Sequence, residues 1–166
     1  MTLLEAATKA DELAQAGSER ELAALRQEWD DELEAAARSS DYRERAIAYR
    51  AVGLFRFRQK LELLRRGLED DSPAVRGAAL ISLEQLSREH PGVVNQVRPL
   101  LHTMLSTDPN GAVRRLAVLC LRNGSAQRET LVILNGLADD DEEDAELRKA
   151  ARSVSAELRR RAAAKQ

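Results

Sequence analysis

The sequence predicts an all-α fold, a right-handed solenoid of about four helical hairpins behind an N-terminal capping helix. Three observations predict it. A pattern of Asp, then Val-Arg, then small and apolar residues occurs at 70–83 and returns with the same internal offset at 108–121. Hydrophobic residues form 43% of the chain but aromatic residues only 3%, which favours closely packed helices around Leu, Ala and Val. Charged residues form 33%, and good helix formers dominate among them.

Capping residues delimit the first two predicted helices. Thr2 can cap a helix that runs to about Ala16, and Gly17 ends it because glycine adopts positive φ without strain. Ser18 followed by Glu21 matches the capping-box pattern, which opens a second helix reaching about residue 38.

The third and fourth predicted helices cover residues 42–55 and 58–68. Asp41 ends a Ser-Ser-Asp sequence and can cap the first of them, since its carboxylate accepts a bond from a free N–H of the first turn. Gly53 loosens the end of that helix. No proline separates the two helices, so the boundary between them carries the weakest sequence signal in the chain.

Prolines mark the fifth and sixth predicted helices. Pro73 opens a helix over residues 74–88, because a missing N–H has no consequence in the first helical turn. His90-Pro91-Gly92 breaks this helix. The sixth helix, over residues 93–105, contains Pro99, which removes one backbone hydrogen bond and predicts a kink.

Turn sequences separate the last three predicted helices, which cover residues 112–122, 125–137 and 145–162. The turn at 108–111 precedes the first of them, and Asn123-Gly124 ends it. Ser125 can then cap the eighth helix. An acidic loop over residues 139–144 leads into the last one.

These helices leave no room for a sheet, so residues 1–166 are expected to form one solenoid domain. Residues 1–17 would form the capping helix, residues 18–162 the repeats and residues 163–166 a frayed tail. The single cysteine, Cys120, is predicted to be a buried thiol on an apolar helix face. No long apolar run and no basic signal region are present, so we expect a cytoplasmic protein without a membrane partner.

The pairing of helices, with Asp in the turn and Val-Arg opening the second helix, resembles the HEAT repeat family. The matching pairs are Val75-Arg76, Val113-Arg114 and Leu147-Arg148, with Arg45 as a degenerate first member. Their arginines lie 31, 38 and 34 residues apart. These spacings are shorter than the roughly 40–47 residues of eukaryotic units and are similar to short bacterial HEAT-like repeats. The resemblance covers about residues 18–162.

The Asp and Arg of this motif are predicted to be structural. A carboxylate just before a helix satisfies free N–H groups and favours the positive end of the helix dipole. An arginine at the same turn of successive repeats can reach the aspartate of the neighbouring turn and hold one repeat on the next. Asp70, Asp108, Arg76 and Arg114 are therefore expected to stabilise the repeats rather than to bind a ligand.

No catalytic, cofactor or metal site is predicted. His90 and His102 have no partner histidine at helical spacing, and Cys120 has no second thiol beside it. The acidic run at 139–144 lacks the alternating ligands and central glycine of a calcium loop, so a solvated loop is expected. No Gly-rich phosphate loop or nucleophile elbow is present. We therefore expect a protein that is not an enzyme.

The equivalent solvent-side positions of the repeat helices, aligned from the motif arginine, are Arg50, Ile81, Leu119 and Ser153, and three cations lie nearby. The candidate partner-binding residues taken from these positions and their neighbours are Arg50, Ile81, Arg115, Leu119, Arg122 and Lys149. An apolar groove with a basic rim suits a partner helix or an acidic peptide. Alternatively, Ile81 and Leu119 are buried against the preceding helix. The main prediction is a noncatalytic scaffold or adaptor whose concave face binds another protein, with its oligomeric state left open.

A basic stretch within residues 43–66 supports an alternative function. The net charge of the chain is −2, yet this stretch carries Arg43, Arg45, Arg50, Arg56, Arg58, Lys60, Arg65 and Arg66. Phe55 and Phe57 are interleaved, and basic groups with aromatic rings can follow a phosphate backbone and stack on bases. The competing interpretation is that these cations pair with the acidic second helix. Nucleic-acid binding is thus the alternative, and an enzyme subunit or a lyase-like HEAT protein is a third.

Overall fold

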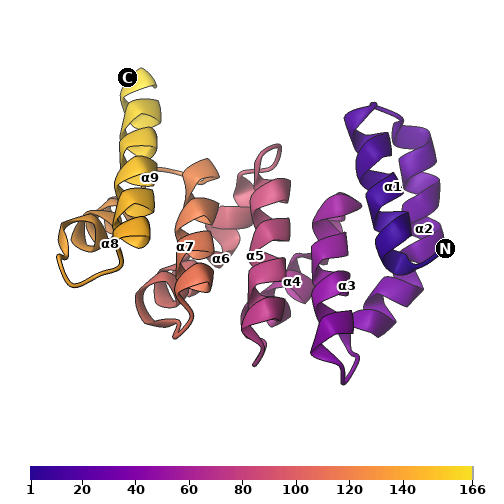
Figure 1. The fold of residues 1–166 in the computed structure, drawn as a ribbon. Coiled ribbons are helices and arrows are strands. Elements are labelled where there is room, and N and C mark those ends of the chain that lie inside the picture. The colour runs from indigo at the N-terminus through magenta and orange to yellow at the C-terminus, as the bar shows by residue number, and fades with distance from the viewer. Residues whose placement is uncertain (166) are drawn as a thin grey trace. The chain divides into compact units, whose positions relative to one another are not determined.

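The described part of the chain folds into helices and turns. The structure, a computed structural model, describes residues 1–165, and no strand occurs among them (Figure 1). The α-helices are α1 (Leu3–Gln15), α2 (Glu19–Ala37), α3 (Tyr42–Leu54), α4 (Leu61–Leu68), α5 (Pro73–Ser87), α6 (Gly92–Thr107), α7 (Gly111–Cys120), α8 (Arg128–Asp139) and α9 (Ala145–Ala164). Two 3₁₀ turns, η1 (Arg58–Lys60) and η2 (Leu121–Asn123), join them. The predicted all-α solenoid class is confirmed.

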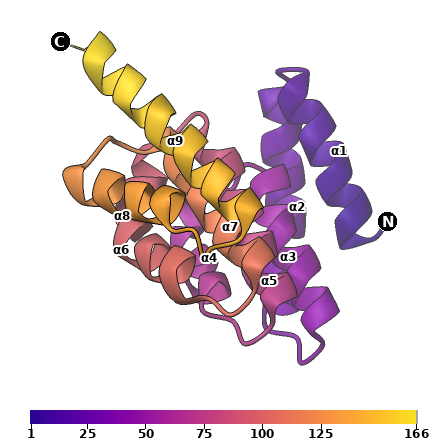
Figure 2. The same cartoon turned by 60° about the vertical axis from the view of Figure 1, so that its left-hand side comes forward.

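The chain divides into two compact units, residues 1–86 and residues 87–166. In the first unit, α1 packs on both α2 and α3, and α2 packs on α3 (Figure 2). In the second unit, α6 packs on α7, and α9 packs on both α7 and α8. The single domain expected from the sequence remains a prediction.

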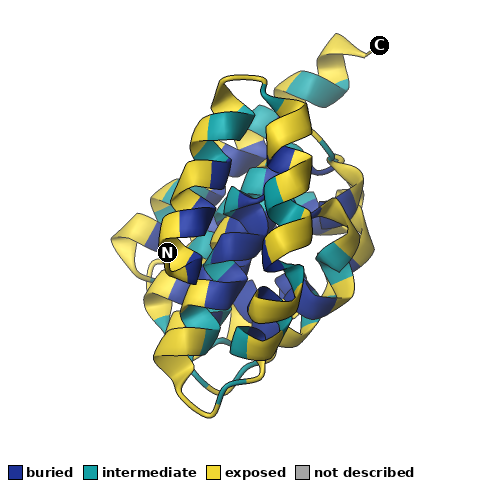
Figure 3. Cartoon of the chain, turned by 90° about the vertical axis from the view of Figure 1, so that its right-hand side faces the viewer, coloured by how far each residue is buried: buried dark blue, intermediate teal, exposed yellow. Residues whose placement is uncertain are grey.

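Leucine, alanine and valine dominate the core of each unit, as their composition predicts. Large side chains buried in the first unit include Leu22, Leu33 and Phe55, and those in the second include Leu101 and Leu134. Full burial of one such side chain stabilises the fold by about 2 kcal/mol. In Figure 3 the helices nearest the viewer carry exposed residues on their outer side and buried residues toward the interior. The predicted burial of Cys120 is confirmed.

Three of the four predicted boundaries at the start of the chain are confirmed. The Thr2 hydroxyl accepts a bond from the Glu5 N–H at 3.2 Å, and the Glu5 carboxylate accepts one from the Thr2 N–H at 3.0 Å. Gly17 has φ +72°, and Asp41 caps α3 by accepting from the Arg43 N–H at 2.9 Å. The capping box at Ser18 is wrong, because its ψ of 63° departs from the extended backbone of a cap and its side chain makes no capping bond.

The predicted helix at 58–68 is divided in the structure. Arg56 has φ 59°, and this left-handed residue reverses the chain after α3. Its guanidinium fixes the reversal by donating to the Gly53 carbonyl at 2.9 Å and by pairing with Asp11 at 2.9 Å. The chain then enters η1 as a 3₁₀ turn and becomes α-helical only at Leu61.

A close contact between α3 and α5 depends on Gly53 and Ser82. The Ser82 side chain is fully buried, accepts a bond from the Gly53 N–H at 2.9 Å and donates to the carbonyls of Tyr49 and Arg50. A Cβ atom on Gly53 would lie 2.8 Å from the Ser82 Cα. Glycine is therefore required here for the approach of the two backbones.

Several helix boundaries in the second unit also differ from the prediction. Ser125 does not cap α8, because its hydroxyl lies with Asn95 and Arg98 and the helix begins only at Arg128. At the other end, α9 continues to Ala164, beyond the expected end at residue 162. The last residue of the expected tail, Gln166, lies outside the described residues.

Candidate partner-binding surface

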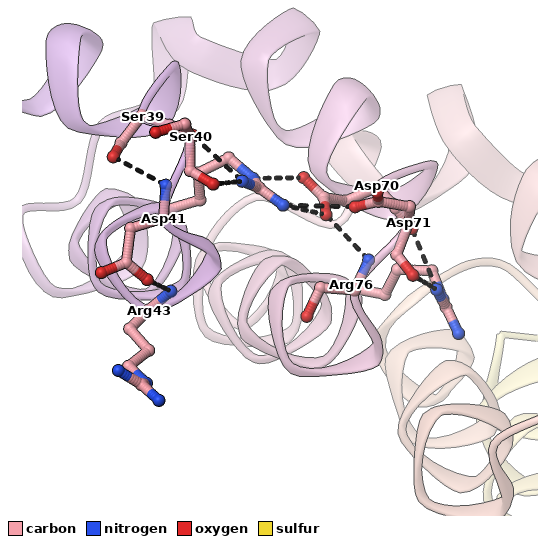
Figure 4. A network of polar contacts seen from close by, with 9 residues as sticks. Ser39, Ser40, Asp41, Arg43, Asp70, Asp71 and Arg76 are labelled. Carbon is pink, nitrogen blue, oxygen red and sulfur yellow. Dashed lines mark hydrogen bonds and ion pairs between the residues drawn. The ribbon is translucent and has the colours of Figure 1, made fainter.

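A network of polar contacts joins two repeats of the first unit. Arg45 on α3 forms a bidentate pair with Asp70, with Nε and Nη2 donating to its carboxylate oxygens at 2.9 and 3.0 Å (Figure 4). The same guanidinium donates to the carbonyl of Ser39 at 3.0 Å. Asp70 also accepts from the Ser72 N–H in the turn just before α5, and Arg76 donates to the Asp70 carbonyl, each at 2.9 Å. The predicted contact between an arginine and the aspartate of the neighbouring turn is thus present.

The charge of Asp70 is stabilised by this network. Burial by itself would raise the pKa of Asp70, but the hydrogen bonds from Arg45 and from the Ser72 N–H outweigh it and hold the pKa below its ordinary value of 3.8. The Arg45 and Asp70 side chains are only 16% and 12% exposed, so water screens their attraction less than at a free surface.

The second unit contains the same type of junction with a different acid. Arg114 on α7 forms a bidentate pair with Glu143, at 2.9 and 2.7 Å, in the loop before α9. Its Nε also donates to the Leu105 carbonyl at 2.9 Å. Hydrogen bonds from Arg114 hold the pKa of Glu143 below its ordinary value of 4.5. The acidic run, which we expected to be a solvated loop, thus contributes a structural partner.

The two predicted binding residues of the first unit differ in their surroundings. Ile81 on α5 is 38% exposed, so the alternative that it is buried does not hold. Arg50 on α3 is half-buried and donates to the Gln85 side chain at 2.9 Å. Part of its hydrogen-bonding capacity is therefore used within the unit.

Three predicted residues of the second unit, Arg115, Leu119 and Lys149, lie on the adjacent helices α7 and α9. We call these three residues the α7/α9 surface. Arg115 and Lys149 each follow a motif arginine directly, and both are exposed. Leu119 is half-buried and lies one helical turn beyond Arg115. The structure thus places a partly exposed leucine on a helix that also presents an exposed cation.

The predicted placement of Arg122 on the seventh helix is wrong. That helix ends at Cys120, and Arg122 lies in η2, where the chain turns toward α8. The Arg122 carbonyl accepts a hydrogen bond from Arg161. Because η2 has 3₁₀ geometry, Arg122 does not continue the α-helical face on which Arg115 lies.

Most cations of the basic stretch have intramolecular partners. Lys60 forms ion pairs with Asp30 and Glu34 of α2, at 2.7 and 2.6 Å, as the competing interpretation expects. Phe55 and Phe57 are buried, with their ring centroids 5.4 Å apart. These rings are therefore not available for stacking on bases.

A buried polar cluster in the second unit was not predicted. Arg98 on α6 is only 4% exposed, and its guanidinium donates to the hydroxyls of Thr130 and Ser125 at 2.9 Å and to the Asn95 side chain. Its Nε has no partner within the described residues. Burial lowers the pKa of Arg98 because these partners carry no charge. Neither helical periodicity nor the charge pattern could reveal this cluster, since an arginine usually lies at the surface.

The imidazole of His102 belongs to the same cluster, with Nε2 2.9 Å from the Thr130 hydroxyl. Burial lowers the pKa of His102 below its ordinary value of 6.5. The nearby Glu129 opposes this effect, and the nearby Arg98 adds to it. The folded protein therefore favours the neutral imidazole.

A pH dependence of stability follows from the lowered pKa of His102. Below pH 6.5 the unfolded chain binds a proton at this histidine that the folded chain does not bind. The free energy of unfolding is therefore expected to decrease as the pH decreases, with a slope approaching about 1.4 kcal/mol per pH unit. Urea denaturation at pH 7.5, 6.5 and 5.5 measures it. In His102→Gln this loss should be much smaller, and equal losses in both proteins would assign it to other groups.

The described residues contain neither a candidate metal site nor a candidate membrane-spanning helix. Within residues 1–165 no group of three or more His, Cys, Asp or Glu side chains is arranged to hold a metal ion. None of the helices in this part of the chain has both the length and the apolar character needed to cross a membrane.

A comparison with protein-family models finds a match to HEAT repeats over residues 30–103. The matched segment runs from α2 into α6 and includes the Arg45–Asp70 junction and the Val75-Arg76 pair. No curated protein matches the chain. The Arg114–Glu143 junction repeats the same contact beyond the matched segment. The resemblance inferred from the sequence is thus confirmed, and residues 30–103 of the chain belong to the HEAT repeat family.

Proposed function

We propose that this protein is a noncatalytic scaffold or adaptor that binds a protein partner through the second helices of its repeats, the face expected to be concave in a HEAT solenoid. HEAT repeats generally serve as protein-interaction scaffolds. The observation that carries the proposal is the α7/α9 surface, because it combines a half-buried Leu119 with two exposed cations. On the first unit, Ile81 is exposed and Arg50 is half-buried.

The chemistry of the α7/α9 surface favours an acidic partner helix or peptide. Leu119 supplies apolar area, which drives association, and Arg115 and Lys149 supply charge, which selects an acidic partner and accelerates the encounter. An apolar side chain flanked by carboxylates on one face of a helix would match this pattern. Nucleic acid is less well supported because the two phenylalanines of the basic stretch are buried.

Charge reversal at this surface tests the proposal. A pull-down from a lysate of the source cells, quantified by mass spectrometry, should recover a partner with the parent protein. The double variant Arg115→Glu, Lys149→Glu should reduce its recovery by about tenfold or more, since like charges then face each other. Its melting temperature should stay close to that of the parent, because both side chains are exposed.

The matched control is Arg58→Glu with Arg66→Glu, two exposed residues of the basic stretch that give the same change in net charge. This control should retain the partner. If the partner is lost with the control and still recovered with the Arg115/Lys149 variant, the basic stretch rather than the α7/α9 surface is the binding surface. A salt-dependent gel shift with the same pattern would then identify nucleic acid as the ligand.

A further inference from the structure

A cavity of about 380 Å³ lies between α8 and α9 in the second unit. We call it the α8/α9 cavity, and its lining residues are Asn135, Ala138 and Asp139 from α8 and Arg152, Ser155, Ala156 and Arg159 from α9. On each helix these positions recur at intervals of three or four residues, so they share one face. Two of them are alanines, whose short side chains leave space between the longer polar ones. Lys149 is not among the lining residues, so the cavity is separate from the α7/α9 surface.

Hydrogen-bond donors dominate the polar lining of this cavity. The hydroxyl of Ser155, which is 3% exposed, donates to Asn135 Oδ1 at 2.9 Å. This bond orients the Asn135 amide and engages its acceptor, so the Nδ2 donors are the part of the amide available to a ligand. Arg152 Nη2 donates to the Ala138 carbonyl at 3.3 Å, which holds the guanidinium at the C-terminal end of α8.

The two arginines lie two helical turns apart, about 10 Å along the axis of α9, and both line the cavity. Both side chains are exposed, and an arginine side chain is long enough for the two guanidinium groups to approach one ligand from opposite ends of the cavity. Each planar guanidinium can offer two parallel N–H donors to a phosphate or carboxylate group.

We infer that the α8/α9 cavity binds a phosphate monoester. Two guanidinium groups match the charge of a phosphate dianion, and the amide of Asn135 offers further donors to its tetrahedral oxygens. The volume leaves room for the organic part of the ester beside the phosphate group. Asp139 in the cavity lining would repel the phosphate and so limits affinity. This inference does not depend on the proposed partner-binding function, because it concerns other residues.

An NMR titration of the whole protein tests the inference. The probes are inorganic phosphate, phenyl phosphate and a phosphoserine peptide, and the readout is the side-chain amide signal of Asn135. The monoesters should shift this signal saturably, and the comparison of phenyl phosphate with the peptide shows whether a free ester or a phosphorylated partner binds more tightly. No saturable shift with any of the three probes would overturn the inference.

Matched variants distinguish phosphate binding in the cavity from nonspecific electrostatic attraction of phosphate to α9. Arg159→Gln should weaken binding by about tenfold, since one charge-assisted pair is lost. Arg160→Gln makes the same change in net charge at the next residue, which pairs with Glu157 and does not line the cavity, so it should bind like the parent. Asp139→Asn should bind more tightly. Equal weakening by Arg159→Gln and Arg160→Gln, or no gain in Asp139→Asn, would place the phosphate outside the cavity.

Discussion

Replacing Gly53 with alanine is expected to lower the free energy of unfolding by about 3 kcal/mol, at the upper end of the range for overpacked sites. The new Cβ would lie 2.8 Å from the Ser82 Cα, and a backbone atom cannot move aside as a flexible side chain can. Separation of α3 from α5 would also weaken the bond from the Gly53 N–H to the buried Ser82 hydroxyl. Urea denaturation followed by circular dichroism measures the loss.

Gly136→Ala is the control for this experiment. Gly136 lies within α8, and a Cβ atom there would meet nothing within 4 Å. Alanine restricts the unfolded chain and favours the helix, so this variant should gain about 0.5–1 kcal/mol. A Gly53→Ala protein as stable as the parent would mean that α3 and α5 separate without loss, and the close contact would then have no structural importance.

Asp70→Ala is expected to cost about 2–3 kcal/mol at pH 7, because it removes one partner of a largely buried ion pair. Arg45 would lose both bonds to the Asp70 carboxylate, and the Ser72 N–H would lose its acceptor. Because the pKa of Asp70 in the folded protein lies below 3.8, its contribution is present above that pH and is lost as the pH falls further. The difference between variant and parent should therefore shrink in acid.

Asp71→Ala is a matched control for Asp70→Ala. Asp71 contacts the same Arg45 guanidinium at 3.2 Å, but its side chain is 95% exposed. A charge so well solvated contributes little to stability, so the free energy of unfolding of the control should be close to that of the parent. If both variants lose the same stability at pH 7, net charge rather than the buried pair explains the effect.

The fold could be predicted from the sequence because its signals are local and repeated. Thr2, Gly17, Asp41 and Pro73 each mark a boundary through their own backbone or capping chemistry, and all four lie at or within two residues of an observed boundary. Ser18 and Ser125 match the same capping patterns and fail. Whether a serine caps depends on the backbone angles and neighbours that tertiary packing imposes, and these cannot be read from the residue pattern.

The candidate surfaces were predicted less completely, because charges must be located in space before they can be assigned. Sequence placed Lys60 in a basic stretch, but its partners Asp30 and Glu34 lie on a different helix. Similarly, the acidic run before α9 contains several carboxylates, and only the structure shows that Glu143 is the one that meets Arg114. Spacing along the chain indicates which residues share a helix face, not which faces meet.

The two arginine junctions have a consequence for how such repeats can change in length. Arg45 meets an Asp 25 residues later, whereas Arg114 meets a Glu 29 residues later. A long side chain with five donors can accept a carboxylate from different positions in the following turn. Insertions or deletions in these turns are therefore tolerated as long as one acid remains within reach. Successive repeats can diverge in sequence and spacing while the arginine continues to hold the next turn in place.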